Sequence, residues 1–198
     1  AVLSIESNNA PTPFILGLDA AGRPTVKVRM SNGSWTECCL PDPISERRWA
    51  RLWASFSQPS GELSVGICQD GVDDIADTTF TGSTALSDQK INSIVVAACD
   101  QGDRHMHFNG KIERPTIYSA QLGSEVLLNR AEAITAPVFA CWDFSDEISS
   151  TRVIDTGVNQ LHGTLVNYPS RAMTGANWDG SEMCWRHAPQ HYGAIHFH

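Results

Sequence analysis

The chain has 198 residues, of which 41% are hydrophobic and 18% are charged, and its formal net charge is −8. This size and composition fit one folded domain with a proper core and exclude a disordered chain. The acidic balance argues against a nucleic-acid partner, because phosphates would be repelled in the absence of a basic patch. No apolar run approaches the roughly 20 residues needed to cross a bilayer, so we expect no membrane partner either.

Both ends of the sequence read as the middle of a strand. The chain starts at Ala1 without an initiating methionine or an apolar leader, and it stops at His198 inside a second strand-like run. We therefore expect a fragment of a longer polypeptide.

The first third of the chain predicts strands separated by turns. Residues 2–7 alternate between apolar and polar side chains, residues 14–19 predict a strand that is apolar up to Asp19, and residues 25–30 alternate cleanly, with both valines and Met30 on one face. The stretch 8–13 between the first two strands is rich in turn residues. This pattern is typical of antiparallel β-structure.

The middle of the chain predicts a hairpin, a long loop and a buried strand. Residues 49–56 form a strand that is apolar on both sides, and residues 62–68 form its partner. Residues 69–90 are rich in Asp, Thr and Ser without periodicity, which predicts a loop of the kind that often carries function. Residues 94–99 predict a buried strand.

Residues 106–119 form the stretch around which the prediction is organised. Asn109-Gly110 is a strong signal for a type I′ hairpin, in which both central residues have positive φ. Pro115 cannot donate to a strand ladder, so this part belongs to an edge or a bulge. Residues 124–134 predict the one short helix, with Ser124 as its N-cap and Glu125 in its first turn.

Three more strands are expected at residues 138–144, 153–157 and 161–167. Strands that recur roughly every 8 to 12 residues with turn signals between them predict an antiparallel β-sandwich. Two interpretations of the late strands stay open. They could begin a second repeat or complete the sheets of the same sandwich, and the short remaining length favours late closure.

Two groups of residues resemble laminin-G-like domains of the concanavalin A-like jelly rolls. One group resembles the closing hairpin and helix of such a domain, and the Trp-Asp-Phe strand at 142–144 with the run 155–167 resembles its opening. The fold class implied is all-β, an antiparallel jelly-roll β-sandwich with one short helix. The residues of the closing pattern are Phe108, Gly110, Ile112, Ile117, Tyr118, Leu122, Ser124 and Glu125.

The sandwich together with the tail, from Asn167-x-Pro169-x-Arg171-Ala172 to His196-Phe197-His198, resembles the large (beta) subunits of N,N-dimethylformamidase. The resemblance implies a laminin-G-like sandwich over residues 1–170 and, over residues 171–198, a connector and first strand toward a missing catalytic region. It implies an iron-dependent parent enzyme that hydrolyses a small formamide to formate and an amine.

By the same resemblance, two Tyr and a Glu hold the iron downstream of His198. None of Tyr118, Tyr168 and Tyr192 lies in a matching context, so no catalytic, cofactor-binding or metal residue is assigned to this chain. The expected partners are the remainder of the polypeptide and other subunits. This segment alone is not expected to be catalytic.

The cysteines favour free thiols in a reducing compartment, hence a cytoplasmic protein. No CxxC pair is present, so a zinc knuckle is not indicated. Cys68 and Cys99 end apolar runs and are interpreted as small core residues. The six cysteines are Cys38, Cys39, Cys68, Cys99, Cys141 and Cys184.

Several local features could carry chemistry, but for each a structural role is the stronger interpretation. His187 and His191 are four residues apart, and histidine pairs at such a spacing can bind a metal ion. Pro189 lies between them and argues against a helix that would bring the two side chains to one face. The Ser87-x-x-Lys90 pattern lacks its companion motifs. Asp100 and Asp103 are possible Ca²⁺ ligands, and His105 and His107 fit a half-exposed strand. The potential metal group comprises Cys184, His187, His191, His196 and His198.

The alternative function is a carbohydrate-binding laminin-G-like module. It would require a shallow groove lined by exposed Trp or Tyr beside polar side chains. A glycosidase is disfavoured, because the acidic residues cluster in turns rather than along one strand.

Overall fold

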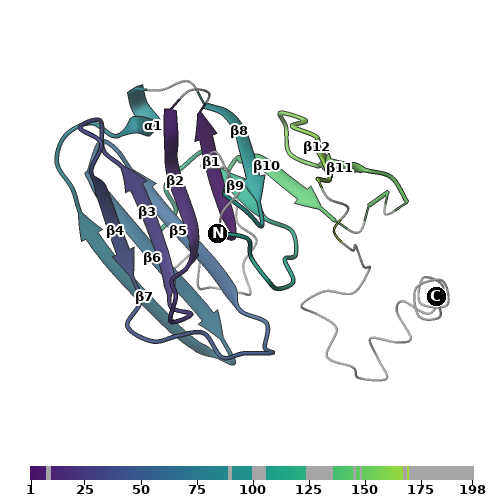
Figure 1. Ribbon diagram of the computed structural model, residues 1–198, viewed down its shortest axis with the longest axis horizontal. Helices are drawn as coiled ribbons and strands as arrows, with labels where there is room; N and C mark the ends of the chain where they lie inside the picture. The colour runs from purple at the N-terminus through teal and green to yellow at the C-terminus, as the bar shows by residue number, and fades with distance from the viewer. Residues whose placement is uncertain are drawn as a thin grey trace. The chain divides into compact units, whose positions relative to one another are not determined.

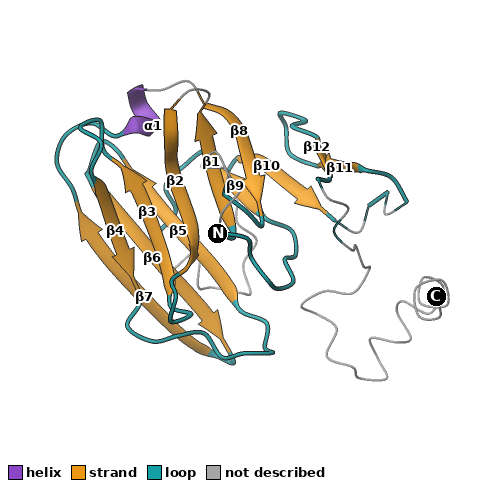
Figure 2. Cartoon of the chain, viewed as in Figure 1, coloured by secondary structure: helices purple, strands orange, loops and turns teal. Residues whose placement is uncertain are grey.

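The computed structural model describes residues 1–7, 10–88, 91–99, 106–123, 136–144, 146–147, 149–166 and 169. Nearly all regular structure within these ranges is strand, and the helix there is a single turn, α1 (Ala85–Asp88) (Figure 2). The predicted all-β class with antiparallel sheets is therefore confirmed, while the jelly-roll type stays a prediction. The chain divides into two compact units, unit 1 (residues 1–110 and 121–134) and unit 2 (residues 111–120 and 135–198).

The first sheet of unit 1 has five antiparallel strands in the order β4-β3-β2-β1-β8 (Figure 1). Its alternation follows the sequence: Val26 and Val28 are fully buried, while Lys27 points outward and pairs with Glu37 across the strands at 2.9 Å. The strands are β1 (Leu3–Ser7), β2 (Ala10–Leu18), β3 (Pro24–Arg29), β4 (Trp35–Cys39) and β8 (Ile91–Val96).

The second sheet of unit 1 has the order β5-β6-β7 and packs on the first as the other layer of a sandwich, with β6 and β7 against β3 and β4 (Figure 1). Leu63 and Val65 of β6 have no exposed area and face the core between the layers. Burying each of these side chains stabilises the fold by about 1.5–3 kcal/mol. The strands are β5 (Arg51–Ser57), β6 (Glu62–Gln69) and β7 (Val72–Thr79).

The prediction of a loop over residues 69–90 is wrong, because β7 lies within it. Gln69 pairs with Val72, so Asp70 and Gly71 form a two-residue turn, with φ values of 52° and 83°. Asp-Gly with positive φ at both positions is the chemistry of a type I′ hairpin. β7 is polar because it is the edge strand of its sheet and exposes much of its surface.

The hairpin predicted at Asn109-Gly110 is also wrong. Residues 106–115 form no strand, and the positive φ values fall at Met106 (69°) and Arg114 (43°) rather than at the Asn-Gly pair. The Phe108 ring folds over Gly110, where an added Cβ would lie 2.6 Å from Cε1 of the ring. The backbone N–H of Phe108 donates to the carbonyl of Ala97 at 2.9 Å. These local contacts replace the expected turn.

Three smaller predictions also needed correction. Residues 94–99 were expected to form a buried strand, but β8 ends at Val96, lies at the edge of its sheet, and residues 94–98 are only half-buried, while Cys99 is buried. β2 begins at Ala10, inside the stretch expected to turn. β4, which contains two cysteines, was not predicted as a strand.

Unit 2 contains a four-stranded antiparallel sheet in the order β12-β11-β10-β9. The two strands expected at 138–144 and 153–157 are present at nearly those positions, whereas the third shrinks to two residues. Late closure of the sandwich, and a domain boundary at residue 170, stay predictions. The strands are β9 (Thr116–Tyr118), β10 (Val138–Asp143), β11 (Arg152–Asp155) and β12 (Gly163–Thr164).

The predicted helix at 124–134 and the tail at 171–198 lie outside the described residues. Among the residues that are described, no helix has the length and apolar character needed to cross a membrane.

Candidate functional site

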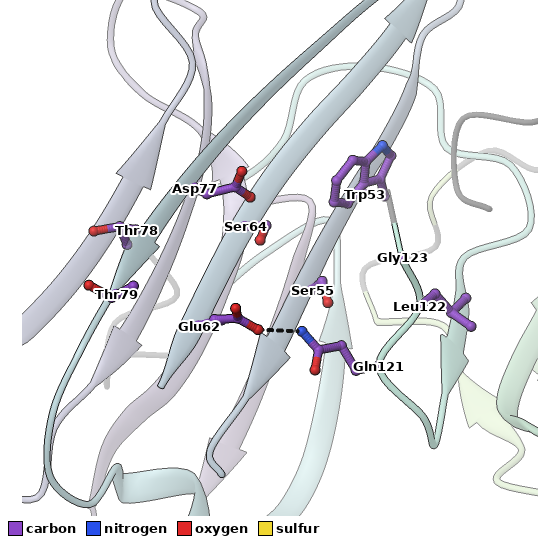
Figure 3. A pocket seen from close by; sticks show the side chains of 10 residues that line it. All are labelled: Trp53, Ser55, Glu62, Ser64, Asp77, Thr78, Thr79, Gln121, Leu122 and Gly123. Carbon is purple, nitrogen blue, oxygen red and sulfur yellow. Dashed lines mark hydrogen bonds between the residues drawn. The ribbon is translucent and has the colours of Figure 1, made fainter. Parts of the chain in front are cut away.

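A cavity of about 540 Å³ opens on the β5-β6-β7 sheet (Figure 3). Glu62 and Ser64 of its lining alternate along β6 with the buried Leu63 and Val65, so the cavity lies on the face opposite to those two residues. This volume falls within the range of small-molecule sites, about 300–1,000 Å³. The cavity is lined by Trp53, Ser55, Glu62, Ser64, Asp77, Thr78, Thr79, Gln121, Leu122 and Gly123.

Strand register brings the polar lining together. Ser55, Ser64 and Asp77 lie directly opposite one another across the three strands. In antiparallel sheets, such opposed side chains stand on one face. The polar row is therefore continuous across the sheet, although its members are far apart in the sequence.

Trp53 forms the apolar wall of the cavity, and Gly66 makes room for it. Gly66 lies opposite Trp53, and an added Cβ on this glycine would come within 2.1 Å of the indole Cζ2 atom. Only a residue without a side chain lets the indole lie flat over β6. Trp53 as a whole is 7% exposed.

Among the residues that the structure describes, the cavity has an acidic lining, with two carboxylates and no basic side chain. The carboxylate of Glu62 accepts hydrogen bonds from Gln121 Nε2 at 3.1 Å (Figure 3) and from the Ser60 hydroxyl at 2.8 Å. These bonds, with that from Gln121 the larger influence, hold the pKa of Glu62 below its ordinary value. Glu62 is thus ionised at neutral pH, and the lining favours ligands that donate hydrogen bonds over anions.

Two buried polar atoms of the cavity lining are unsatisfied. Trp53 Nε1 and Ser55 Oγ have no hydrogen-bond partner in the part of the chain that the structure describes. A buried donor or acceptor without a partner costs about 1–3 kcal/mol, so each such atom in a folded protein calls for a specific explanation.

The motif that resembles the opening of a laminin-G-like domain, residues 142–144 with 155–167, holds a loop of unit 2 in place through side-chain hydrogen bonds to backbone. The buried carboxylate of Asp155 accepts three backbone N–H bonds, from Cys141 and Gly157 to one oxygen and from Leu161 to the other, each at 2.7 Å. Burial alone would raise the pKa of Asp155, but the three donors outweigh it, and the pKa lies below its ordinary value. The carboxylate thus ties β10 to the loop after β11.

Other residues of the same motif form hydrogen bonds that hold the same loop. Asn159 Nδ2 donates to the Phe139 carbonyl at 2.8 Å, and Trp142 Nε1 donates to the Leu161 carbonyl at 2.7 Å. The side-chain N–H groups of Asn159 and Trp142 are thus used to hold backbone carbonyls. The motif therefore fixes a loop conformation.

A buried carboxylate lies near a thiol at one end of β1. Glu6 accepts bonds from the hydroxyls of Ser4 and Thr12, and Thr12 Oγ1 lies 3.5 Å from the Cys99 sulfur. Cys99 has no exposed area, and burial raises the pKa of its thiol. A protonated, inaccessible thiol is a poor nucleophile, so this cluster is structural.

The structure places few of the residues singled out from the sequence. Five cysteines are free thiols, and Cys68 and Cys99 are buried as predicted. His107 is exposed. Among the described residues, no three His, Cys, Asp or Glu side chains are close enough to hold a metal ion.

The remaining predicted residues lie wholly or partly outside the described ranges. Ser87 belongs to α1, but the structure does not describe its side chain or Lys90. The others outside these ranges are Asp100, Asp103, His105, Tyr168, Cys184, His187, His191, Tyr192, His196 and His198.

Two curated proteins are similar to part of this chain, and both are named N,N-dimethylformamidase beta subunit. The protein from Paracoccus aminophilus is 44% identical over 100 residues, which are 46% of this chain and 13% of that protein. The protein from Alcaligenes sp is 37% identical over 134 residues, which are 62% of this chain and 18% of that protein. No family model matches the chain.

The chain thus spans less than a fifth of the length of these relatives. Its homology to part of two beta subunits confirms the resemblance inferred from the sequence. Neither relative favours the carbohydrate-binding alternative.

Proposed function

We propose that this chain is a non-catalytic β-sandwich segment of an amide hydrolase of the N,N-dimethylformamidase type. The complete polypeptide would add water across a small formamide, giving formate and an amine. The similarity to two beta subunits carries this proposal.

The non-catalytic role is supported by how the reactive groups of the described residues are used. The carboxylate of Asp155 is occupied by three backbone donors, and the thiol of Cys99 is buried with a raised pKa. A general acid or a nucleophile must reach the substrate with a proton or an electron pair to give. Neither group meets that requirement.

Iron is the cofactor that the resemblance implies, held by two Tyr and a Glu in another region of the polypeptide. The described residues do not supply such a set: Tyr118 is their one tyrosine, and no three acidic, His or Cys side chains cluster there. We assign no iron ligand and no reaction step to this segment.

The partners in this proposal are the remainder of the same polypeptide and other subunits. The word "subunit" in the names of both relatives supports an assembly. A cytoplasmic location and a laminin-G-like jelly-roll topology belong to the same proposal. Free thiols at Cys38, Cys39, Cys68, Cys99 and Cys141 support the reducing compartment.

The test is formamide hydrolysis by the intact polypeptide, expressed with its neighbouring subunits in iron-supplemented medium. We expect stoichiometric formate and dimethylamine from N,N-dimethylformamide, and iron in the purified protein by elemental analysis. Absence of hydrolysis in an iron-loaded, folded preparation would refute the activity.

A substitution separates the segment from the catalytic centre. Cys99→Ser keeps a small polar side chain beside Glu6 and Thr12 and removes the thiol. We expect kcat to stay within about twofold of the parent enzyme, because a catalytic nucleophile would cost several orders of magnitude. A loss of about 1,000-fold with an unchanged melting temperature would place chemistry in this segment.

A further inference from the structure

The cavity on the β5-β6-β7 sheet offers hydrogen-bonding groups that the protein leaves unused. Trp53 Nε1 can only donate, and it has no acceptor among the described residues. Ser55 Oγ, also buried and unpaired, can donate or accept. The carboxylates of Glu62 and Asp77, by contrast, can only accept.

These groups define the chemistry of a complementary ligand. It must present one acceptor to the indole N–H and at least one donor to the carboxylates or to Ser55. An anion is disfavoured, because the described part of the lining has two carboxylates and no basic residue. A simple cation would satisfy the carboxylates but leave the indole N–H unpaired.

The cavity already binds one group of this kind, from the protein itself. The side-chain carboxamide of Gln121 donates through Nε2 to the carboxylate of Glu62 at 3.1 Å (Figure 3). Asp77 presents a second carboxylate to the same cavity, in line with Ser64 and Ser55 across the sheet.

The positions of the unused groups suit a second carboxamide. Trp53 Nε1 lies over the middle strand, since a Cβ on Gly66 would come within 2.7 Å of it. Asp77 is on the neighbouring strand, two residue pairs further along. Adjacent strands are about 4.8 Å apart and two residues along a strand span about 6.8 Å, so the two positions are roughly 8 Å apart. One planar group with a carbonyl oxygen and an N–H on opposite sides, hydrogen-bonded at both ends, can bridge that distance.

We propose that this cavity binds a small organic molecule through a carboxamide that keeps at least one N–H. The carbonyl oxygen accepts from Trp53 Nε1, and the N–H donates to Asp77 or Ser55. The volume of about 540 Å³ leaves room for an apolar body of roughly the size of an aromatic ring beside the indole.

The test uses three probes of similar shape on the intact protein, with binding measured by isothermal titration calorimetry. Benzamide has both the acceptor and the donors, N,N-dimethylbenzamide lacks the N–H, and benzoate replaces the carboxamide with an anion. We expect benzamide to bind about tenfold more tightly than N,N-dimethylbenzamide, and benzoate not to bind.

Variants tie the binding to the cavity. Asp77→Asn and Trp53→Phe should each weaken benzamide binding about tenfold. The matched control is Asp73→Asn, an exposed acid of the same strand outside the lining, which should leave the affinity unchanged. Circular dichroism melting checks folding, and Asp77→Asn alone decides the result if Trp53→Phe unfolds.

No binding of benzamide up to its solubility limit, or equal affinity for all three probes, would overturn the proposal. So would an equal loss in Asp73→Asn and Asp77→Asn. These results are independent of formamide hydrolysis, because none of the probes is used as a substrate.

Discussion

Among the acidic residues of unit 2, Asp155 is expected to cost the most stability when it is substituted. In Asp155→Asn, one carboxylate oxygen becomes an NH₂ group that faces a backbone N–H, most simply that of Leu161, which now bonds at 2.7 Å. Leaving this N–H unpaired costs about 1–3 kcal/mol. The bonds from Cys141 and Gly157 survive but lose the charge, which about halves their strength. We expect a total loss near 3 kcal/mol, and a larger loss in Asp155→Ala.

Hydrogen–deuterium exchange and thermal denaturation measure this loss. The amides of Cys141, Gly157 and Leu161 should exchange much faster in Asp155→Asn, since about 3 kcal/mol corresponds to a factor above 100. The control is Asp42→Asn, an exposed loop acid in unit 1, which should change neither exchange nor melting. A loss below 1 kcal/mol in Asp155→Asn would refute the view that the carboxylate holds the loop.

The same residue predicts a pH dependence. The folded pKa of Asp155 lies below its ordinary value. Its ionised form therefore contributes stability above the unfolded pKa of about 4, and that contribution is lost as the pH falls through the lower, folded value. The stability difference between the parent protein and Asp155→Asn should shrink below about pH 4. A difference that stays constant down to acid unfolding would contradict this assignment.

Two glycines give further predictions. Gly66→Ala would place a Cβ within 2.1 Å of the Trp53 indole, so the ring must move. We expect this substitution to lower the free energy of unfolding, measured by urea titration, by about 1–3 kcal/mol. The control is Gly163→Ala, whose Cβ would come no closer than 3.6 Å to Val153 Cβ and which should be close to neutral. Gly71→Val forces a β-branched residue into φ near 83° in the β6–β7 turn and should lower the melting temperature through a loss of about 1–2 kcal/mol. An unchanged melting temperature would mean that the turn adopts another conformation.

Local alternation predicted the interior strands well. β3 follows its sequence pattern because its sheet has one buried face and one exposed face, so that valine and lysine must alternate. β7 was missed because an edge strand need not alternate: its side chains meet solvent on several sides. Asp70-Gly71 was the turn signal that could have revealed it. Asn109-Gly110 was the same type of signal, but there Phe108 packs on the glycine, a contact that dipeptide statistics do not contain.

The cavity could not be predicted from the sequence. Ser55, Ser64 and Asp77 meet only through the register of three strands, and Gln121 reaches Glu62 from a distant segment. Trp53 lies in the strand that was expected to be apolar on both sides, but its unpaired N–H becomes visible only once its neighbours are known. The motif around Asp155 was recognised as a pattern, while its role in fixing backbone needed coordinates.

The acid-rich composition of β7 bears on how this protein behaves at high concentration. The unpaired backbone groups of an exposed edge strand can pair with a strand of a second chain, and such pairing can start aggregation. Here Asp73, Asp74 and Asp77 line that edge, so a copy approaching in the same way would bring like charges together. The acidic residues that made this stretch look like a loop thus oppose edge-to-edge association of neighbouring molecules by charge repulsion.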